Sequence, residues 1–176
     1  MFLLRGMPFI DLAHLRKRDM QDGRITYSRH KTDKPITVRI PREALALIAK
    51  YADRHSASPY LFPILDAGIR DGWLSYRNYQ DALRHFNRKL GQVMSRLLPG
   101  VRVSSYTARH TWATLAFHSG QPVGIISQAL GHSSLRVTET YLKPFGNELV
   151  DKANRQLIAS VRKCKWKNET GYRAGL

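Results

Sequence analysis

The sequence has little cysteine, little acid and no long hydrophobic run. Its one cysteine, Cys164, cannot form an internal disulfide, which excludes a disulfide-stapled secreted domain and fits a reducing compartment. No apolar stretch approaches the ~18 residues that a membrane span requires. The opening MFLLRGMPFID is broken by Arg5, Pro8 and Asp11 too early for a secretion signal. We therefore expect a cytoplasmic protein without a membrane partner.

The shortage of acidic residues leaves a strong positive charge. Lysine and arginine number 29 against 13 aspartate and glutamate, which gives a net charge of +16. Such an excess repels itself in the compact state and is typical of proteins with a polyanionic partner, most often nucleic acid. Ribosomal and membrane-surface proteins share this balance, so charge alone gives only the sign of the partner. A length of 176 residues with 43% hydrophobic side chains predicts one globular domain.

Hydrophobic periodicity predicts a mainly α-helical fold with one small antiparallel β-hairpin. The hairpin strands are residues 24–31 and 36–40, joined by a turn at residues 32–35. Strict alternation would put Ile25, Tyr27, Arg29 and Lys31 on one face, so that the two cations project together near the turn. The segment 60–65 is expected to be an apolar loop packed on the core.

Helices are predicted on both sides of this hairpin. Gly6 ends one helix and Pro8 opens a short one, and a long helix follows Ser75 as its cap. Further helices are expected at residues 42–54 and 76–97, around Ala113 as far as Gly120, from Pro122 to Gly131, from Ser133 or Ser134 through Tyr141 to Pro144, and at 150–161. We expect one domain over residues 1–161 and a basic, loose tail over 162–176.

The segment 104–145 carries a distinctive spacing. It contains Arg109, then Leu130-Gly131-His132, then Thr138, and finally Tyr141 nine residues after His132. This order resembles the C-terminal catalytic block of the tyrosine recombinases, the phage-integrase family, whose signature is His-x-x-Arg followed by Leu-Gly-His-x-x-x-x-x-Thr-x-x-Tyr. The resemblance implies the fold of that catalytic domain and site-specific DNA recombination or integration by a mobile element, in the bacterial cytosol at the nucleoid.

The residue types suit phosphodiester chemistry. Guanidinium groups neutralise phosphate oxygens, a lysine or histidine protonates a leaving oxygen, and a phenol can be the nucleophile. By resemblance, Tyr141 attacks the phosphate to form a 3′-phosphotyrosyl link, Arg109 and His132 bind the non-bridging oxygens, and Lys31 protonates the 5′-oxygen. No metal, ATP or other cofactor is required.

Two positions depart from the family pattern. Pro8 stands where the family has its first catalytic arginine, so a second cation must come from elsewhere; Arg29 is our candidate and Arg5 the reserve. Tyr106 replaces the histidine of His-x-x-Arg, and a phenol is a donor to phosphate but a poor proton shuttle near neutral pH. We also expect DNA contacts from Arg5, Arg77, Arg84, Arg88, Lys89 and Arg136.

The resemblance also implies an assembly and leaves alternatives. Family members work on double-stranded DNA as tetramers on paired sites, often exchanging a C-terminal segment, here residues 150–161. Another helix and a DNA-clamping domain normally precede this block, so we expect a truncated enzyme or a relic.

The rival functions are a DNA-binding remnant with impaired chemistry, type IB topoisomerase-like activity, and an RNA-binding structural protein. The main site residues also have ordinary interpretations: a surface phosphate contact or salt bridge for Arg109, packing for Tyr141, and a surface position for His132. His110 is the reverse case, and we expect it to be a core histidine that fixes its helix. A zinc site from His110, His118 and His132 lacks recognised ligand spacing.

Overall fold

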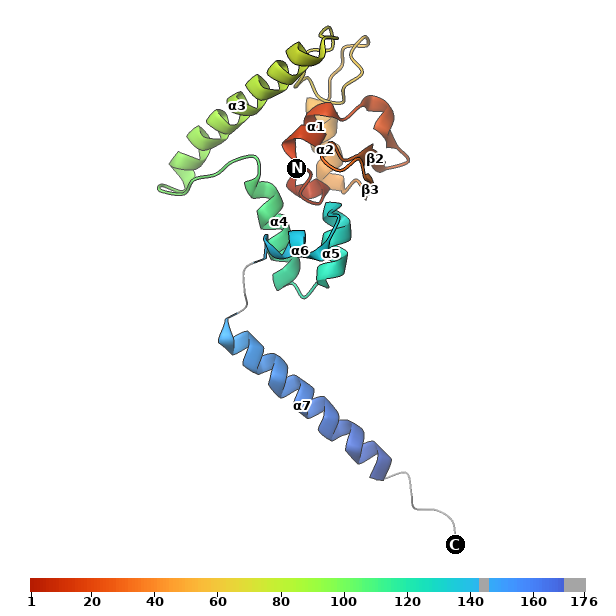
Figure 1. Cartoon of the computed structure of the whole chain (residues 1–176), viewed down its shortest axis with the longest axis vertical. Coiled ribbons are helices and arrows are strands. Elements are labelled where there is room, and N and C mark those ends of the chain that lie inside the picture. Colours follow the sequence, from red (N-terminus) through yellow and green to blue (C-terminus); the bar gives the residue numbers. More distant parts are fainter. Residues whose placement is uncertain (143–145, 170–176) are drawn as a thin grey trace. The chain divides into compact units, whose positions relative to one another are not determined.

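The computed structural model describes residues 1–142 and 146–169. Its contacts divide the chain into two units, residues 1–142 and 143–176, each described by itself. The elements, labelled in Figure 1, are η1 (Phe2–Leu4), α1 (Phe9–His14), η2 (Lys17–Asp19), β1 (Met20–Gln21), β2 (Arg24–Ser28), β3 (Pro35–Arg39), α2 (Arg42–Tyr51), α3 (Gly72–Leu97), α4 (Thr107–His118), α5 (Val123–Leu130), α6 (Leu135–Glu139) and α7 (Asn147–Glu169).

A three-stranded antiparallel sheet of order β1-β2-β3 contains the predicted hairpin. Ile25 lies opposite Val38 and Tyr27 opposite Ile36, so the alternation expected from the sequence is confirmed up to that point. The strand β1 was not predicted. It is only two residues long and pairs Met20 with Ile25 across the Asp22-Gly23 turn.

The prediction that Arg29 and Lys31 share a strand face and project together is wrong. β2 ends at Ser28, and residues 29–34 form a turn closed by a hydrogen bond from the Arg29 amide to the Lys34 carbonyl at 2.9 Å. Period-two alternation therefore stops before Arg29. As a result the Arg29 side chain is buried and that of Lys31 is exposed.

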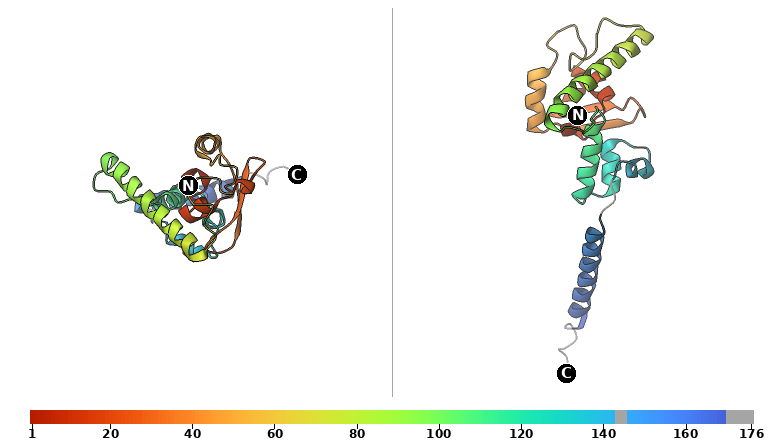
Figure 2. Two further views of the ribbon diagram at one scale, coloured as in Figure 1. Left: turned by 90° about the horizontal axis from the view of Figure 1, so that it is seen from above. Right: turned by 90° about the vertical axis from the view of Figure 1, so that its left-hand side faces the viewer.

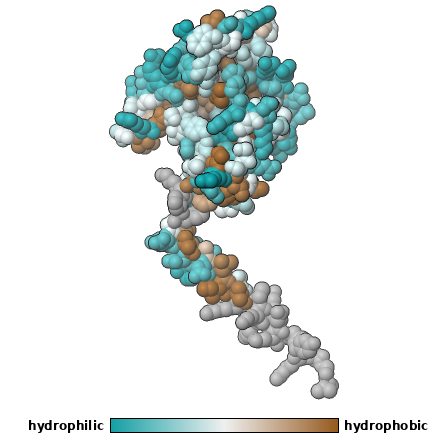
Figure 3. Space-filling model, in the orientation of Figure 1, coloured by the Kyte–Doolittle hydropathy of each residue, from teal (hydrophilic) through white to brown (hydrophobic). Residues whose placement is uncertain are grey.

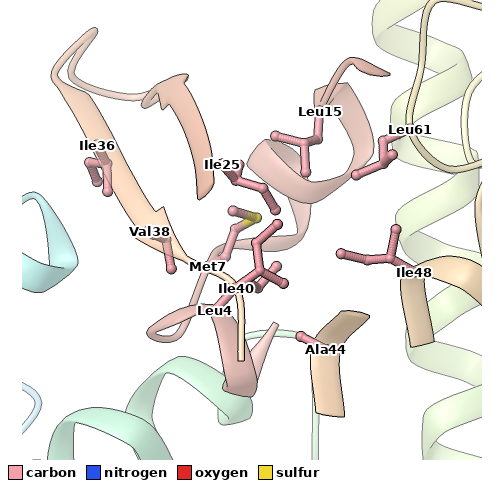
Figure 4. Close-up of a cluster of buried hydrophobic side chains, with 10 residues drawn as sticks. All are labelled: Leu4, Met7, Leu15, Ile25, Ile36, Val38, Ile40, Ala44, Ile48 and Leu61. Carbon is pink, nitrogen blue, oxygen red and sulfur yellow. The ribbon is translucent and has the colours of Figure 1, made fainter. Parts of the chain in front are cut away.

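The main core lies between the sheet, α1 and α2. Ten buried apolar side chains converge there, with Met7 and Ile40 near the middle of the cluster (Figure 4). Leu61 closes the cluster from the loop at 60–65, so the predicted packing of that loop is confirmed. Removing this much apolar surface from water is the dominant favourable term for such a domain.

The bounds of α2 and α3 differ from the predicted ones. α3 begins at Gly72, earlier than expected, because Asp71 rather than Ser75 caps it: the Asp71 carboxylate accepts from the Leu74 amide at 2.8 Å. α2 ends at Tyr51 instead of residue 54. Its buried residues are Ala44 and Ile48.

α3 buries less of its apolar stripe than the periodicity suggests. Tyr79, Leu83 and Phe86 pack against the small cluster around Phe9, whereas Val93 and Leu97 near its C-terminal end are exposed. The periodic spacing along α3 correctly marks an apolar face of this helix. Within this unit, the part of that face beside α1 is packed, and the C-terminal part is exposed.

A second group of helices completes the unit. α4, α5 and α6 lie together in both views of Figure 2, and α4 also contacts η1. Their shared core contains Ala113, Ile126 and Leu130, as the periodicity predicts. Gly131 ends α5 in the left-handed conformation expected of a C-terminal glycine.

The second unit consists of α7 among the described residues. Its apolar side chains include Val150, Leu157 and Val161, all more than half exposed. Brown, hydrophobic surface is visible along this helix in Figure 3. The predicted helix at 150–161 is confirmed as helix. The predicted stop at Pro144 lies outside the described residues, as do the end of the tail and the side chains of 162–169. No described helix is long and apolar enough to cross a membrane.

Candidate active site

Arg109 is the most deeply buried charged side chain of the first unit, with 1% of its surface exposed. It lies near the start of α4 and faces the turn after η1. Gly6 makes this approach possible: its φ is +67°, and a Cβ there would come within 3.1 Å of the Arg109 Cα. The glycine therefore serves both as a left-handed turn and as room for the arginine backbone.

The Arg109 guanidinium is bound by neutral groups. Its Nη1 donates to the Gly6 carbonyl at 3.0 Å, and its Nη2 donates to the Leu130 carbonyl at 2.6 Å and to His132 Nε2 at 3.0 Å. Its Nε–H finds no acceptor within residues 1–142 and 146–169. The Gly6 carbonyl, the Leu130 carbonyl and the His132 ring thus fix the guanidinium, while its buried Nε–H donor stays unpaired.

His132 is a neutral imidazole with a defined tautomer. Arginine can only donate, so Nε2 accepts and the proton sits on Nδ1, which donates to Thr138 Oγ1 at 2.9 Å. Burial, reinforced by the charges of Arg109 and Arg29, lowers the pKa of His132 to about 4. His132 therefore orients the Arg109 guanidinium in this state.

Tyr141 lies just beyond α6 rather than within it, which corrects the predicted helix. α6 ends at Glu139, and the Tyr141 amide donates to the Thr138 carbonyl at 3.0 Å in the following turn. Thr114 of α4 donates to the Tyr141 carbonyl at 3.1 Å. These bonds carry the phenol ring to 5.1 Å from the His132 ring and to 5.9 Å from Arg109 Cζ.

Two further rings complete an aromatic box around Tyr141. Tyr106, the residue that caps α4, places its hydroxyl against the Tyr141 hydroxyl in a short contact. The His110 ring lies 4.5 Å from the Tyr141 ring and 5.2 Å from the Tyr106 ring. The expectation that His110 is a core residue is wrong, because it is exposed and packs on the tyrosines instead.

Arg29 enters the same region from the hairpin turn. Its Nη1 donates to the Gly131 carbonyl at 3.1 Å, and its Nε lies 3.8 Å from an Asp11 carboxylate oxygen. Gly131 has φ +65°, and a Cβ there would meet Ile36 Cδ1 at 2.5 Å and Arg29 Cδ at 2.9 Å. A second glycine therefore makes room for a second buried guanidinium.

Asp11 fixes the turn that carries these cations. Its Oδ1 accepts from the His30 amide at 2.9 Å while Oδ2 faces Arg29. Burial raises the pKa of Asp11, opposed by the His30 hydrogen bond and the charge of Arg29. Asp11 was not predicted to be a site residue, although its place between Pro8 and the hairpin was the available signal.

Lys31 lies exposed on the turn, close enough for its charge to contribute to the lowered pKa of His132. Lys34, which was not predicted to be a site residue, donates to the His132 carbonyl at 3.4 Å. The hairpin turn thus supplies one free lysine and one bound lysine beside the Arg109–His132 pair.

The expected DNA-contacting cations are spread over the first unit. Arg77, Arg84, Arg88 and Lys89 are exposed on α3, and Arg136 is exposed on α6. Arg84 pairs with Asp81 in a short contact, and Arg5 donates to the Thr37 carbonyl at 3.4 Å. Among the described residues, no three histidine, cysteine or acidic side chains cluster as metal ligands would.

Charge balance shows what the cluster can bind. Arg109 has no carboxylate partner among the described residues, and Asp11 is the single buried carboxylate near both arginines. Leaving a buried guanidinium unneutralised is costly. An anion reaching the unpaired Nε–H of Arg109 would supply both the missing charge and the missing acceptor, and the Tyr141 ring lies 5.9 Å from Arg109 Cζ.

A mainly helical domain with a small antiparallel sheet has the fold of tyrosine-recombinase catalytic domains. The profile described as "Phage integrase family" matches residues 3–148. The chain belongs to the phage integrase family.

Named relatives support the same assignment. Tyrosine recombinase XerA of Pyrococcus furiosus is 28% identical over 153 residues, covering 85% of this chain and 50% of the relative. Tyrosine recombinase XerC of Bradyrhizobium diazoefficiens is 29% identical over 142 residues, covering 77% of this chain and 41% of the relative. The chain spans about half the length of these curated relatives.

Solved structures share the fold at low identity. The crystal structure of XerA recombinase superposes with a TM-score of 0.64 at 19% identity, covering 88% of this chain and 54% of that one. XerH site-specific recombinase, bound to a palindromic difH substrate after cleavage, gives 0.62 at 17% identity, covering 86% and 42%.

Proposed function

We propose that this chain carries the catalytic site of a site-specific DNA recombinase or integrase that cuts and rejoins strands through a 3′-phosphotyrosyl link. One observation carries the proposal: the Tyr141 phenol lies beside a buried guanidinium that has an unpaired donor and no carboxylate partner. A nucleophile and an anion site at one place are what attack on a phosphodiester requires.

In the proposed reaction the Tyr141 oxygen forms a bond to phosphorus and the bond from phosphorus to the 5′-oxygen breaks. The Tyr141 proton passes to solvent water, and Lys31 gives a proton to the departing 5′-oxygen. The phosphotyrosyl ester keeps the bond energy, so an incoming 5′-hydroxyl can reverse the sequence without ATP. Neither step needs a metal or an organic cofactor.

Arg109 is assigned to the non-bridging phosphate oxygens and His132 to holding its guanidinium. The Arg109–His132 hydrogen bond at 3.0 Å supports this division of labour. Arg29 is assigned the charge that Pro8 cannot supply. Its burial beside Gly131 supports an electrostatic role behind the phosphate.

Lys31 is assigned as the general acid. Its exposed side chain on the hairpin turn is free to follow the DNA, whereas Lys34 already donates to His132. Replacement of each lysine by arginine keeps the charge but removes the readily released proton. Loss of strand cleavage in Lys31→Arg with activity kept in Lys34→Arg would support the assignment.

The partner is double-stranded DNA, which places the protein at the nucleoid in the cytosol. The exposed cations on α3 and α6, with Arg5, are assigned to the DNA backbone. We further propose a tetramer on paired sites in which α7 is exchanged, supported by its exposed apolar residues Val150, Leu157 and Val161. Sedimentation of the full chain with and without site DNA tests the assembly.

The decisive test uses nicked duplexes built from the sequences that flank this chain's own gene, separated on a denaturing gel after incubation. Wild type should give a covalent protein–DNA band, and peptide mapping should put the phosphate on Tyr141. Tyr141→Phe should give none, and Tyr79→Phe is the matched control. A band of equal strength in Tyr141→Phe would refute the assignment.

A second candidate is a DNA-binding remnant with impaired chemistry. Pro8 and Tyr106, at positions where the family has arginine and histidine, favour it. Tight, salt-sensitive DNA binding without any covalent band would support this alternative. Relaxation of supercoiled plasmid without strand exchange would instead favour the topoisomerase-like activity.

A further inference from the structure

We infer that Tyr106 is a positioning residue that holds the nucleophile: its hydroxyl donates to the Tyr141 oxygen and sets the direction of that oxygen before DNA arrives. The inference rests on the proposed function, because it assigns the work of Tyr106 to the oxygen that attacks. It differs from a phosphate contact, since Tyr106 would act through Tyr141.

The first support is the contact itself. The Tyr106 hydroxyl lies in hydrogen-bond contact with the Tyr141 hydroxyl. Their ring centroids are 6.0 Å apart and the rings are tilted by 38°, so the two phenols meet at their oxygen ends rather than stacking. The bond joins the residue before α4 to the turn after α6.

The second support is the rigidity of the Tyr106 end. Its amide donates to Ser104 Oγ at 3.3 Å, and the Ser105 amide donates to Asn87 Oδ1 of α3 at 2.7 Å. Tyr106 also begins the helix that carries Arg109 three residues later. Through Tyr106, the Tyr141 oxygen is therefore held by α4, the same helix that carries the Arg109 guanidinium proposed to bind the phosphate.

The third support is that Tyr106 keeps a proton to donate. Burial, together with the Tyr141 hydroxyl, raises the pKa of Tyr106, so this phenol stays protonated near neutral pH and is available as a donor to the Tyr141 oxygen. The groups that face it are Tyr141, His110 and the two arginines Arg109 and Arg29. Tyr106 keeps its proton throughout, and the Tyr141 proton still leaves to water.

This arrangement serves both directions of the reaction. During attack it points a lone pair of Tyr141 at the phosphate bound beside it. During rejoining the Tyr141 oxygen leaves with developing negative charge, which a preplaced O–H donor stabilises. Loss of the hydroxyl should therefore affect the chemical step and leave DNA binding intact.

The test compares wild type, Tyr106→Phe and Tyr106→His in single-turnover covalent-adduct assays at saturating nicked duplex. Tyr106→Phe keeps the ring and removes the hydroxyl, so the rate should fall roughly 10- to 100-fold while the dissociation constant for DNA changes less than about twofold. Tyr106→His restores a donor and should recover much of the rate. Tyr51→Phe, at an exposed tyrosine outside the site, is the matched control.

The pH profile separates positioning from mere packing. In wild type, the rate of adduct formation should show no titration of this donor between about pH 6 and 8. In Tyr106→His, the rate should gain a pH-dependent change near the imidazole pKa of about 6.5. An unchanged adduct rate in Tyr106→Phe would overturn the inference and leave the proposed function standing. Equal losses of binding and rate would also overturn it, since they indicate a structural role.

A measurement without DNA distinguishes the two failures. If the hydroxyl pair forms in the free protein, Tyr106→Phe and Tyr141→Phe should each lower the melting temperature, and the double variant should lower it no further than either alone. Additive shifts would overturn the pairing. If the shifts are non-additive but the wild type never forms a covalent adduct, the proposed function is refuted, and the positioning of a nucleophile is refuted with it. The hydrogen bond between the two hydroxyls would still be supported.

Discussion

Lowering the pH should destabilise the protein through His132, by an amount that the structure sets. The imidazole accepts from Arg109 at Nε2 and is buried, which lowers its pKa from an ordinary value of 6.5 to about 4. As the pH falls below about 6.5, the unfolded chain takes up the proton first, so folding stability is lost until the folded pKa is reached. Between about pH 7 and pH 4.5 this costs about 2 kcal/mol.

The assay is urea unfolding of wild type and His132→Gln at both pH values. His14, whose pKa burial also lowers, and Asp11, whose pKa burial raises, contribute to the pH dependence of both proteins equally. The difference between the two proteins therefore isolates His132. His55→Gln, at an exposed position, is the matched control. The same pH dependence in wild type and His132→Gln would refute the assigned tautomer and its bond to Arg109.

Three further outcomes follow from packing and charge. Gly131→Ala should cost roughly 2–4 kcal/mol by thermal unfolding, because a Cβ adds a clash to the left-handed strain, whereas Gly120→Ala, also at positive φ but in open space, should cost only about 1 kcal/mol. Asp11→Asn should lower the free energy of unfolding by about 2 kcal/mol, since it leaves Arg29 buried without a counter-charge; equal stability at neutral pH would contradict the pairing. Arg88→Ala should weaken DNA binding and reduce the slope of log affinity against log salt by about 1, and an unchanged slope would remove Arg88 from the interface.

Much of the fold could be predicted because the relevant signals are local. Apolar spacing located the helices, alternation located the hairpin, and Gly131 marked the end of α5. The errors came from competing local groups. Asp71 offered an earlier cap than Ser75, and α6 stopped before Tyr141 although no proline or glycine stands between them. A five-residue helix is set by its packing on α5, which no local pattern reports.

The candidate site was less predictable, because burial and tertiary partners decide it. The spacing named Arg109, His132 and Tyr141, and the structure brings these three together. Extending the strand alternation to Arg29 failed, because a turn begins there and turns the side chain inward to Asp11. Contacts over long sequence separations, such as Arg29 with Gly131, leave no periodic signal.

The chemistry of the partners explains why the two arginines are held by backbone. A carboxylate on Arg109 would satisfy the guanidinium, but it would also cancel the charge and occupy donors that a phosphate needs. Carbonyls from Gly6 and Leu130 orient the fork with partial charges only, so the attraction for an anion survives. Such close backbone approach is possible where the facing residue lacks a Cβ, which is the case at Gly6 and at Gly131. At Gly6 the left-handed turn therefore does more than end a helix: it lets the Arg109 cation be fixed without being neutralised, so that an incoming anion completes the charge balance. At Gly131 the second cation, Arg29, keeps Asp11 as its counter-charge.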